Sequence, residues 1–256
     1  EGFSIVIACG IFMLAWNTRR YSDNNYLLFI GIAYLFVAIL DFVHTLSFRG
    51  MPIFAGHGAN AATQLWVGAR YMEALTLLAA PFFTNRRIRA SACFAVYGIA
   101  AAALLLSVFY WPVFPDCFLP ASGGLTAFKI ASEYVICLLL FVSALLFIRQ
   151  RQAFERRILF LFLGAIAATI LGELAFTTYA SVFDVSNLLG HYFKIVSFYL
   201  LYKAVIETGL ERPFSLLFRD LNQQRQRLRV TLKSIGDGVI VTDRSRAVTF
   251  LNRVAE

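Results

Sequence analysis

The segment YLLFIGIAYLFVAILDFVHTLSF, residues 26–48, decides the class of fold. It is longer than the roughly 20 apolar residues that an α-helix needs to cross the hydrocarbon core of a bilayer. The charged and imidazole side chains within it are Asp41 and His44, both near one end. The segment therefore predicts a transmembrane helix that carries two polar groups close to one membrane surface.

Six further apolar segments occur along the chain. They are, approximately, Gly2–Trp16, Ala61–Phe83, Ala90–Trp111, Thr126–Ile148, Ile158–Ala180 and Leu188–Ile206. The whole sequence is 59% hydrophobic and 15% charged, whereas a soluble domain is about half apolar and a quarter charged. Residues 1–206 are therefore predicted to form an all-α polytopic membrane helix bundle of about seven spans. The first segment is short, which indicates that further residues precede Glu1.

The arginines between these segments predict the orientation of the bundle. The first, third and fifth connections contain nine arginines, whereas Arg49 is the single basic residue in the second, fourth and sixth. Because cytoplasmic loops are enriched in Lys and Arg, we expect the N-terminal end outside and the C-terminus in the cytoplasm. The net charge of +8 then follows from topology, and no nucleic-acid partner is expected.

Residues 207–234 are rich in Arg and Gln and are predicted to form a cytoplasmic signalling helix that starts near Pro213. Apolar residues recur at every seventh position, as along one edge of a coiled-coil seam. These residues are Phe214, Leu221, Leu228 and Ile235. The pattern favours a homodimer through parallel helices. The alternative is an amphipathic helix that lies on the anionic inner leaflet of the membrane.

Residues 235–256 change in character after Gly236-Asp237-Gly238, which interrupts the helix. Two β-branched segments, Val239–Asp243 and Ala247–Leu251, are predicted to form a hairpin, and Asn252 is placed to cap a following helix. A helix that leads into a hairpin is typical of the start of a soluble α/β domain. This piece is too short to bury a core of its own.

Ten polar residues lie within the expected spans, where such groups are costly and usually functional. They are Asp41, His44, Gln64, Arg70, Glu73, Lys129, Glu133, Glu173, His191 and Lys194. Most of them are expected in the outer half of the bundle, at a rise of about 1.5 Å per residue. One interpretation is a network of ion pairs that fixes helix packing. The other is a polar cavity, open to the outside, that binds a small ligand, a proton or a metal.

His44 and His191 are expected at the same depth on different helices. Both are expected to lie beside carboxylates. Imidazole and carboxylate together can hold a transition metal, and two imidazoles can hold a haem iron, although no metal-binding spacing such as HExxH accompanies them. The alternative is a hydrogen-bonded or pH-sensitive histidine. His57 is expected to be exposed in a glycine-rich loop. Trp66 and the other large aromatic residues are interpreted as interface anchors or packing, and no catalytic residues are predicted because no nucleophile with a positioned base is recognisable.

Several short motifs together carry a family likeness. They are Trp16-Asn17-x-Arg19-Arg20, Asp41-Phe42-x-His44-Thr45, Gln64-Leu65-Trp66 with Arg70-Tyr71, Phe114-Pro115-x-Cys117, Phe128-Lys129 with Glu133-Tyr134, Glu173-Leu174-x-Phe176 and Gly190-His191-x-x-Lys194. As an ordered set over residues 1–220, they resemble the third type of bacterial membrane-associated sensor domain. Residues 234–243, with Asn252 and Ala255-Glu256, resemble the opening of a PAS domain.

The resemblance implies a membrane input region in the bacterial inner membrane that signals to an output domain outside this chain. In such proteins the output is a histidine kinase or a diguanylate cyclase, sometimes with a phosphodiesterase. A small-solute transporter or channel is the alternative, but it needs polar groups that continue to the inner face. A membrane enzyme would need a catalytic constellation that is not recognisable here.

Overall fold

The computed structural model describes residues 1–20, 25–48, 51, 53–54, 58–84, 86–119, 124–177, 185–234, 236–252 and 254–256, with the side chains of residues 211–220 and 233 left out. The described residues form two compact units, Glu1–Leu210 and Glu211–Glu256. His57 and Ile235, for which the sequence makes predictions, lie outside the described residues.

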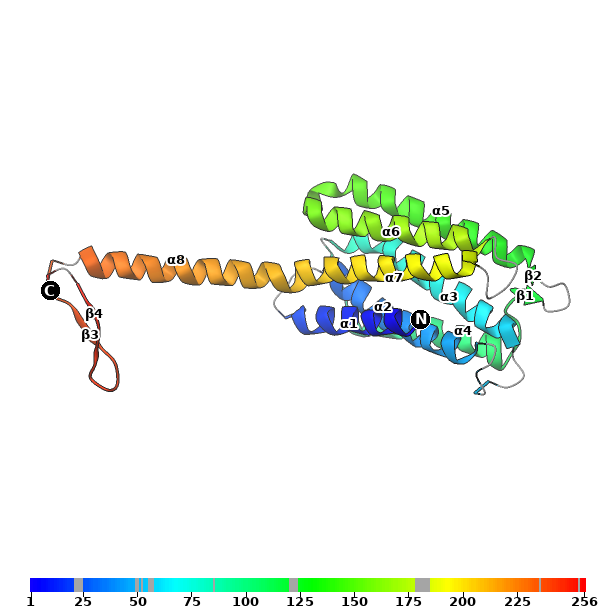
Figure 1. Cartoon of the computed structure of the whole chain (residues 1–256), viewed down its shortest axis with the longest axis horizontal. Coiled ribbons are helices and arrows are strands. Elements are labelled where there is room, and N and C mark those ends of the chain that lie inside the picture. Colours follow the sequence, from blue (N-terminus) through cyan, green and yellow to red (C-terminus); the bar gives the residue numbers. More distant parts are fainter. Residues whose placement is uncertain are drawn as a thin grey trace. The chain divides into compact units, whose positions relative to one another are not determined.

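The first unit is a bundle of seven helices that lie side by side (Figure 1). They are α1 (Gly2–Thr18), α2 (Asn25–Leu46), α3 (Gly58–Ala79), α4 (Ala90–Phe109), α5 (Ala127–Arg149), α6 (Arg156–Phe176) and α7 (Val185–Ile206). One cavity is lined by residues from the N-terminal ends of α1, α3, α5 and α7 and from the C-terminal ends of α2 and α6. Consecutive helices therefore run in opposite directions.

Short elements complete the connections of the bundle. The 3₁₀ turns η1 (Ala80–Phe83) and η2 (Arg151–Ala153) follow α3 and α5, and a two-stranded hairpin of β1 (Phe118–Leu119) and β2 (Gly124–Leu125) precedes α5. The Thr126 hydroxyl accepts a hydrogen bond from the Lys129 N–H at 3.2 Å and so caps the start of α5.

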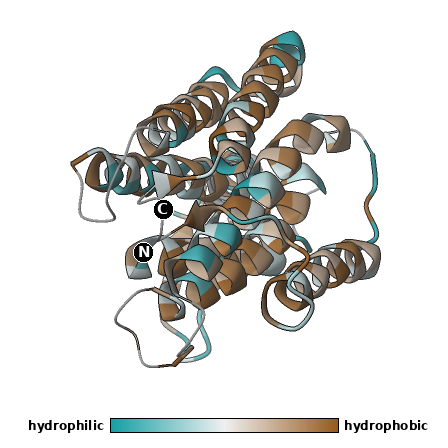
Figure 2. Cartoon of the chain, turned by 90° about the vertical axis from the view of Figure 1, so that its right-hand side faces the viewer, coloured by the Kyte–Doolittle hydropathy of each residue, from teal (hydrophilic) through white to brown (hydrophobic). Residues whose placement is uncertain are grey.

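Four helices in the described part of the chain, α2, α4, α5 and α6, are long and apolar enough to cross a membrane. The helix α1 is apolar but shorter, and α3 and α7 carry several of the predicted polar residues in their middle turns. The prediction of a helical membrane bundle is therefore confirmed, whereas the number of about seven spans stays a prediction. Large apolar side chains such as Ile99, Leu138 and Phe160 are exposed on the bundle surface, and the helices are mainly hydrophobic (Figure 2).

The helix α2 lies at the centre of the packing, because it contacts α1, α3 and α4, while α7 packs against α1 and α6. Glycines permit two close approaches. A Cβ added at Gly31 would lie 2.4 Å from the Cβ of Ala15 across the α1–α2 contact, and one added at Gly190 would lie 2.4 Å from the ring of Phe176 across the α6–α7 contact. In each pair the helices approach closely because glycine has no side chain.

The second unit contains α8 (Arg212–Ser234) and a hairpin of β3 (Ile240–Thr242) and β4 (Val248–Leu251), both strands within the segments predicted to be extended. The predicted start of a helix near Pro213 agrees with α8, which begins at Arg212, and a π-helix, Glu207–Glu211, that was not predicted precedes it without a non-helical residue. Proline has no N–H for an α-helical bond, and π-helical turns occur where the regular ladder is interrupted.

Asn252 organises the hairpin end of this unit. Its side chain is buried and accepts hydrogen bonds from the N–H groups of Val239 (2.9 Å) and Ala255 (3.1 Å), while its amide donates to the Asp237 carbonyl at 2.7 Å. The residue that the sequence marks as a helix cap thus also holds the two ends of the hairpin together.

Candidate functional site

The ten predicted site residues lie on five helices, α2, α3, α5, α6 and α7. Nine of their side chains are buried, and His191 is partly exposed. Nine of the ten divide into three groups: an ion network, a carboxylate pair and the wall of a cavity. Gln64 belongs to none of these, since its amide donates to the carbonyls of Phe114 (2.9 Å) and Pro115 (3.0 Å) and so fastens α3 to the loop after α4.

The ion network consists of Asp41, Arg70, Glu73 and Lys194 and joins three helices. Arg70 Nη2 donates to both carboxylate oxygens of Asp41 at 3.1 Å, and Arg70 Nη1 donates to Glu73. The ammonium of Lys194 lies 2.9 Å from Asp41 Oδ2. Asp41 therefore receives a cation from α3 and another from α7, which ties both helices to α2.

Two aromatic residues, Tyr34 and Trp66, make further contacts with the ion network. The Tyr34 hydroxyl donates to Glu73 Oε1 at 2.8 Å. The Trp66 ring faces both cations, with its centroid 4.9 Å from the Arg70 guanidinium carbon and 4.4 Å from Lys194 Nζ. Buried charges persist in proteins only when they are paired and hydrogen-bonded. The network pairs two cations with two carboxylates, while Arg70 Nε has no hydrogen-bond partner among the described residues.

The carboxylate pair consists of Glu133 on α5 and Glu173 on α6. Lys129 Nζ lies 2.7 Å from Glu133 Oε1 and donates to the Phe176 carbonyl at 2.8 Å. The Glu173 carboxyl interacts electrostatically with Glu133, Arg70 and Lys129. This group places two buried carboxyls beside Lys129, and Arg70 connects it to the ion network.

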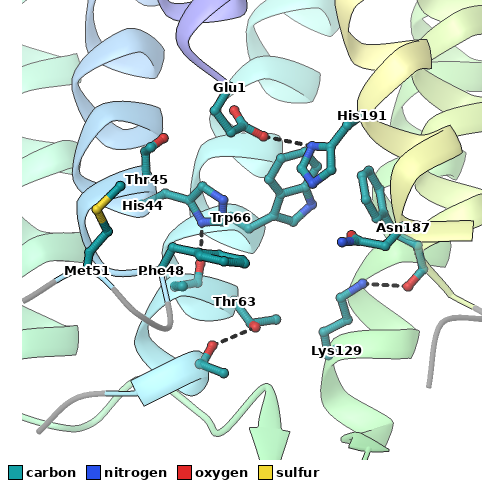
Figure 3. A pocket seen from close by; sticks show the side chains of 13 residues that line it. Glu1, His44, Thr45, Phe48, Met51, Thr63, Trp66, Lys129, Asn187 and His191 are labelled. Atoms are coloured by element: carbon teal, nitrogen blue, oxygen red, sulfur yellow. Dashed lines mark hydrogen bonds and ion pairs between the residues drawn. The ribbon is translucent and has the colours of Figure 1, made fainter. Parts of the chain in front are cut away.

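The cavity has a volume of about 250 Å³ and contains the two histidines of the prediction in its wall (Figure 3). The ring centroids of His44 and His191 each lie 5.5 Å from that of Trp66, which stands between them in the view of Figure 3. The Phe176 ring packs against Trp66 at 4.7 Å. Trp66, interpreted from the sequence as an anchor or packing residue, is thus a buried wall residue of the cavity.

Glu1 is a member of the site that the sequence reasoning missed. Its Oε1 lies 2.8 Å from His191 Nδ1, and its Oε2 is paired with Lys194. The available signal was a carboxylate directly before an apolar segment, at the same end of the bundle as His44 and His191. Through Glu1, α1 is also connected to the polar groups of α7.

The two histidines do not form a preassembled metal site in the described residues, where no group of three or more His, Cys, Asp or Glu side chains is placed to hold an ion. His44 Nδ1 is hydrogen-bonded to the Ala62 carbonyl at 2.7 Å, which leaves Nε2 as its remaining ring nitrogen. Since structural metal sites generally use several protein ligands, metal or haem binding at His44 and His191 stays a prediction without support from this geometry.

Asn60 and Cys117 are two further residues that position the cavity end of the bundle. The Asn60 side-chain oxygen accepts from the N–H groups of Cys117 (2.8 Å) and Phe118 (2.9 Å), and its amide donates to Asp116. Cys117 is fully buried beside Trp66, and burial raises the pKa of its thiol to about 12. Its role is therefore packing, as a neutral thiol.

Comparison with known proteins assigns the first unit. A family model described as MASE3, a membrane-associated sensor domain, matches residues 1–213. No curated protein and no solved structure matches the chain significantly. The match covers the seven-helix bundle with all ten predicted site residues. The chain therefore belongs to the MASE3 family of membrane-associated sensor domains.

Proposed function

We propose that the chain is the input region of a bacterial signal-transduction protein of the inner membrane, and that the cavity with its adjoining ion network receives the stimulus. The observation that carries this proposal is the position of Lys194. It pairs with Glu1 from the start of α1 and with Asp41 from α2, and it lies on α7, the helix that precedes α8. A change at the cavity therefore has a direct path to the helix that leaves the bundle.

A sensor of this kind requires two states that differ by a few kcal/mol, which a stimulus biases by binding one of them better. The site contains groups suited to such a difference. His191 and Glu1 are partly exposed, whereas Asp41 and Arg70 are buried. A ligand or a proton that alters the Glu1–His191 contact would change the partners of Lys194, and with them the packing of α7.

In this proposal the orientation is the one that arginine placement predicts, with the cavity outside and α8 in the cytoplasm. The hairpin of residues 240–251 would open a PAS domain, and the output would be a histidine kinase or a diguanylate cyclase. We further propose that α8 pairs with a second copy, since Leu221 and Leu228 are exposed seam residues. For transport we find no supporting observation among the described residues: at the end of the bundle opposite the cavity the buried polar side chains are Thr18, Ser143, Glu207 and Thr208, and Glu207 is paired with Arg157.

The test measures the seam of α8 while the cavity end is changed. Leu228→Cys is introduced into the full-length protein, and disulfide cross-linking is followed in native membranes, with Gln226→Cys on the opposite face of the heptad as the matched control. We expect efficient cross-linking of Leu228→Cys alone, at a rate that His191→Ala and Glu173→Gln change in a folded protein.

Three results would contradict the proposal. One is equal cross-linking of Leu228→Cys and Gln226→Cys, which would remove the seam. The second is a loss of folding in both cavity-end variants, which would make the polar groups structural. The third is a cross-linking rate that neither folded variant alters, which would show that changes at the cavity end do not affect α8.

A further inference from the structure

The cavity wall is richer in cationic and hydrogen-donating groups than in acids. Among its described lining residues are Lys129, His44 and His191, whereas Glu1 is the carboxylate of that set. Lys194 lies just behind the wall, in contact with Glu1 and with the face of Trp66. Lys129 is paired with Glu133, and Lys194 with Asp41 and Glu1, so both ammonium charges are compensated. The wall still offers more nitrogen groups that can donate hydrogen bonds than carboxylates, and this favours a ligand that accepts hydrogen bonds.

Trp66 supplies a second observation that is independent of charge. Its side chain is about 5% exposed, and its indole Nε1–H is buried without a hydrogen-bond partner among the described residues. Buried N–H groups are almost always paired in folded proteins, and tryptophan Nε1 can only donate. A wall residue of this kind is suited to a ligand that brings a hydrogen-bond acceptor.

Glu1 indicates which acceptor the cavity takes. Its carboxylate approaches His191 Nδ1 at 2.8 Å and also reaches Lys194, so the chain's own carboxyl group already occupies the basic end. The contact with His191 is a close ionic approach but not an aligned hydrogen bond, because both His191 Nδ1 and Glu1 Oε1 lack a hydrogen-bond partner among the described residues. A carboxylate that is free to orient itself can make this contact better.

The rest of the wall defines the body of the ligand. Phe48, Met51, Trp66 and Phe176 give the cavity a largely apolar surface, and Figure 3 shows Phe48 and Met51 on the same side as His44. A volume of about 250 Å³ accommodates a molecule the size of one substituted aromatic ring. Aromatic walls of this kind favour a flat ring through edge-to-face and stacked contacts.

We propose that the cavity binds a small organic carboxylate with a ring-sized apolar body, whose carboxylate accepts from Trp66 Nε1 and replaces Glu1 at His191. This inference rests on the proposed function, since it names the class of stimulus for the same cavity. Because Glu1 precedes α1 and His191 lies on α7, exchange of one carboxylate for the other alters the link between these two helices.

The test uses phenylacetate as the probe and isothermal titration calorimetry on the full-length protein in lipid nanodiscs. Phenylacetamide, which is neutral, and 2-phenylethylamine, which is cationic, are matched probes of nearly the same shape. We expect saturable binding of phenylacetate, binding of the amide at least about tenfold weaker, since hydrogen bonds to charged groups are the stronger ones, and no measurable binding of the amine.

Two variants assign the contacts. Trp66→Phe keeps an aromatic wall but removes the N–H and is expected to weaken phenylacetate binding by about tenfold. Trp111→Phe makes the same chemical change at an exposed position outside the cavity and is expected to leave the affinity unchanged. Glu1→Gln removes the competing carboxylate and is expected to tighten binding, which keeps the proposal testable if Trp66→Phe does not fold.

The proposal is overturned if phenylacetate shows no saturable binding, if the three probes bind equally, or if Glu1→Gln weakens binding. An unchanged affinity in folded Trp66→Phe also overturns it. These results are distinct from a failure of the proposed function. If phenylacetate binds but does not alter cross-linking of Leu228→Cys, the ligand site stands and the relay to α8 fails. If phenylacetate does not bind while His191→Ala changes cross-linking, the relay stands and the ligand class is wrong.

Discussion

Asp41 is the residue on which most of the buried charge depends. It accepts two contacts at 3.1 Å from Arg70 and one at 2.9 Å from Lys194, all without solvent exposure. Buried ion pairs of this kind add little stability over an apolar replacement, but removal of one partner leaves a charge uncompensated. Substitution of Asp41 alone is therefore expected to cost more stability than replacement of the whole ion network by apolar residues.

This asymmetry gives the prediction at the residue scale. Asp41→Asn is expected to lower the free energy of unfolding by about 3 kcal/mol or more, because Arg70 and Lys194 lose their shared anion. The measurement is reversible unfolding in mild detergent, followed by circular dichroism. Asp116→Asn, the same change on an exposed loop, is the control and should cost much less. Equal stability of the two variants would show that Asp41 is not essential to the network.

The sequence identifies the residues of the site, but it does not predict most of the contacts that they make between helices. The spacing of three residues between Arg70 and Glu73, and of four between Lys129 and Glu133, puts each pair on one helix face, and both pairs are in contact. The pairing of Asp41 with Arg70 joins two helices and depends on their packing, which no local pattern encodes. For the same reason Glu1, which lies far along the chain from His191 and Lys194, was not connected with them.

At the scale of the helix, the close contacts at glycine are the most sensitive features of the bundle. A methyl group at Gly31 would meet the methyl group of Ala15 at 2.4 Å. Neither group has a rotamer that relieves the overlap, so α1 and α2 would have to separate. At Gly98 in α4, by contrast, an added Cβ would lie 3.6 Å from the Phe36 ring, which is ordinary contact.

These two glycines form a matched pair for a prediction. Gly31→Ala is expected to destabilise the bundle by about 1–3 kcal/mol through overpacking. Gly98→Ala is expected to be neutral or slightly stabilising, because alanine favours the helix more than glycine does. Thermal unfolding of both variants in the same detergent checks the difference. The packing of α1 on α2 would be in doubt if Gly31→Ala were as stable as Gly98→Ala.

The apolar segments predicted the helices well because length and hydropathy are local properties. The boundaries of α2, expected at residues 26–48 and found at Asn25–Leu46, differ by at most two residues. The π-helix Glu207–Glu211 was not predicted, since the sequence signal of Pro213 is the same for a new helix and for an irregular turn within a helical stretch. The sequence does not identify Trp66 as a cavity residue, because an aromatic residue in an apolar segment gives the same pattern whether its side chain faces lipid, the core or a cavity.

At the scale of the whole molecule, the arginines predict the orientation in the membrane, and in that orientation the cavity would open to the outside. The loop after α4 and the loop before it are suited to a direct test. Val113 and Arg87 are both exposed, and the proposed topology places them on opposite sides of the membrane.

We expect a membrane-impermeant maleimide to label Val113→Cys in intact spheroplasts and to label Arg87→Cys only after the membrane is permeabilised. The protein without an introduced cysteine is the control for labelling of its own cysteines, of which Cys117 is buried and Cys9, Cys93 and Cys137 are partly exposed. Labelling of Arg87→Cys in intact spheroplasts, with Val113→Cys protected, would invert the topology and place the cavity on the cytoplasmic side.

The contact between Phe176 and Gly190 gives the bundle a mechanical property. The same ring closes the cavity and rests on the α7 backbone with no room for a methyl group. Nearby, a Cβ at Gly172 would meet the Gly190 carbonyl at 3.3 Å, so no compliant side chain separates α6 from α7 there. We therefore expect a molecule that displaces Phe176 from the cavity side to shift α7 as well, because the ring and the α7 backbone are in direct contact.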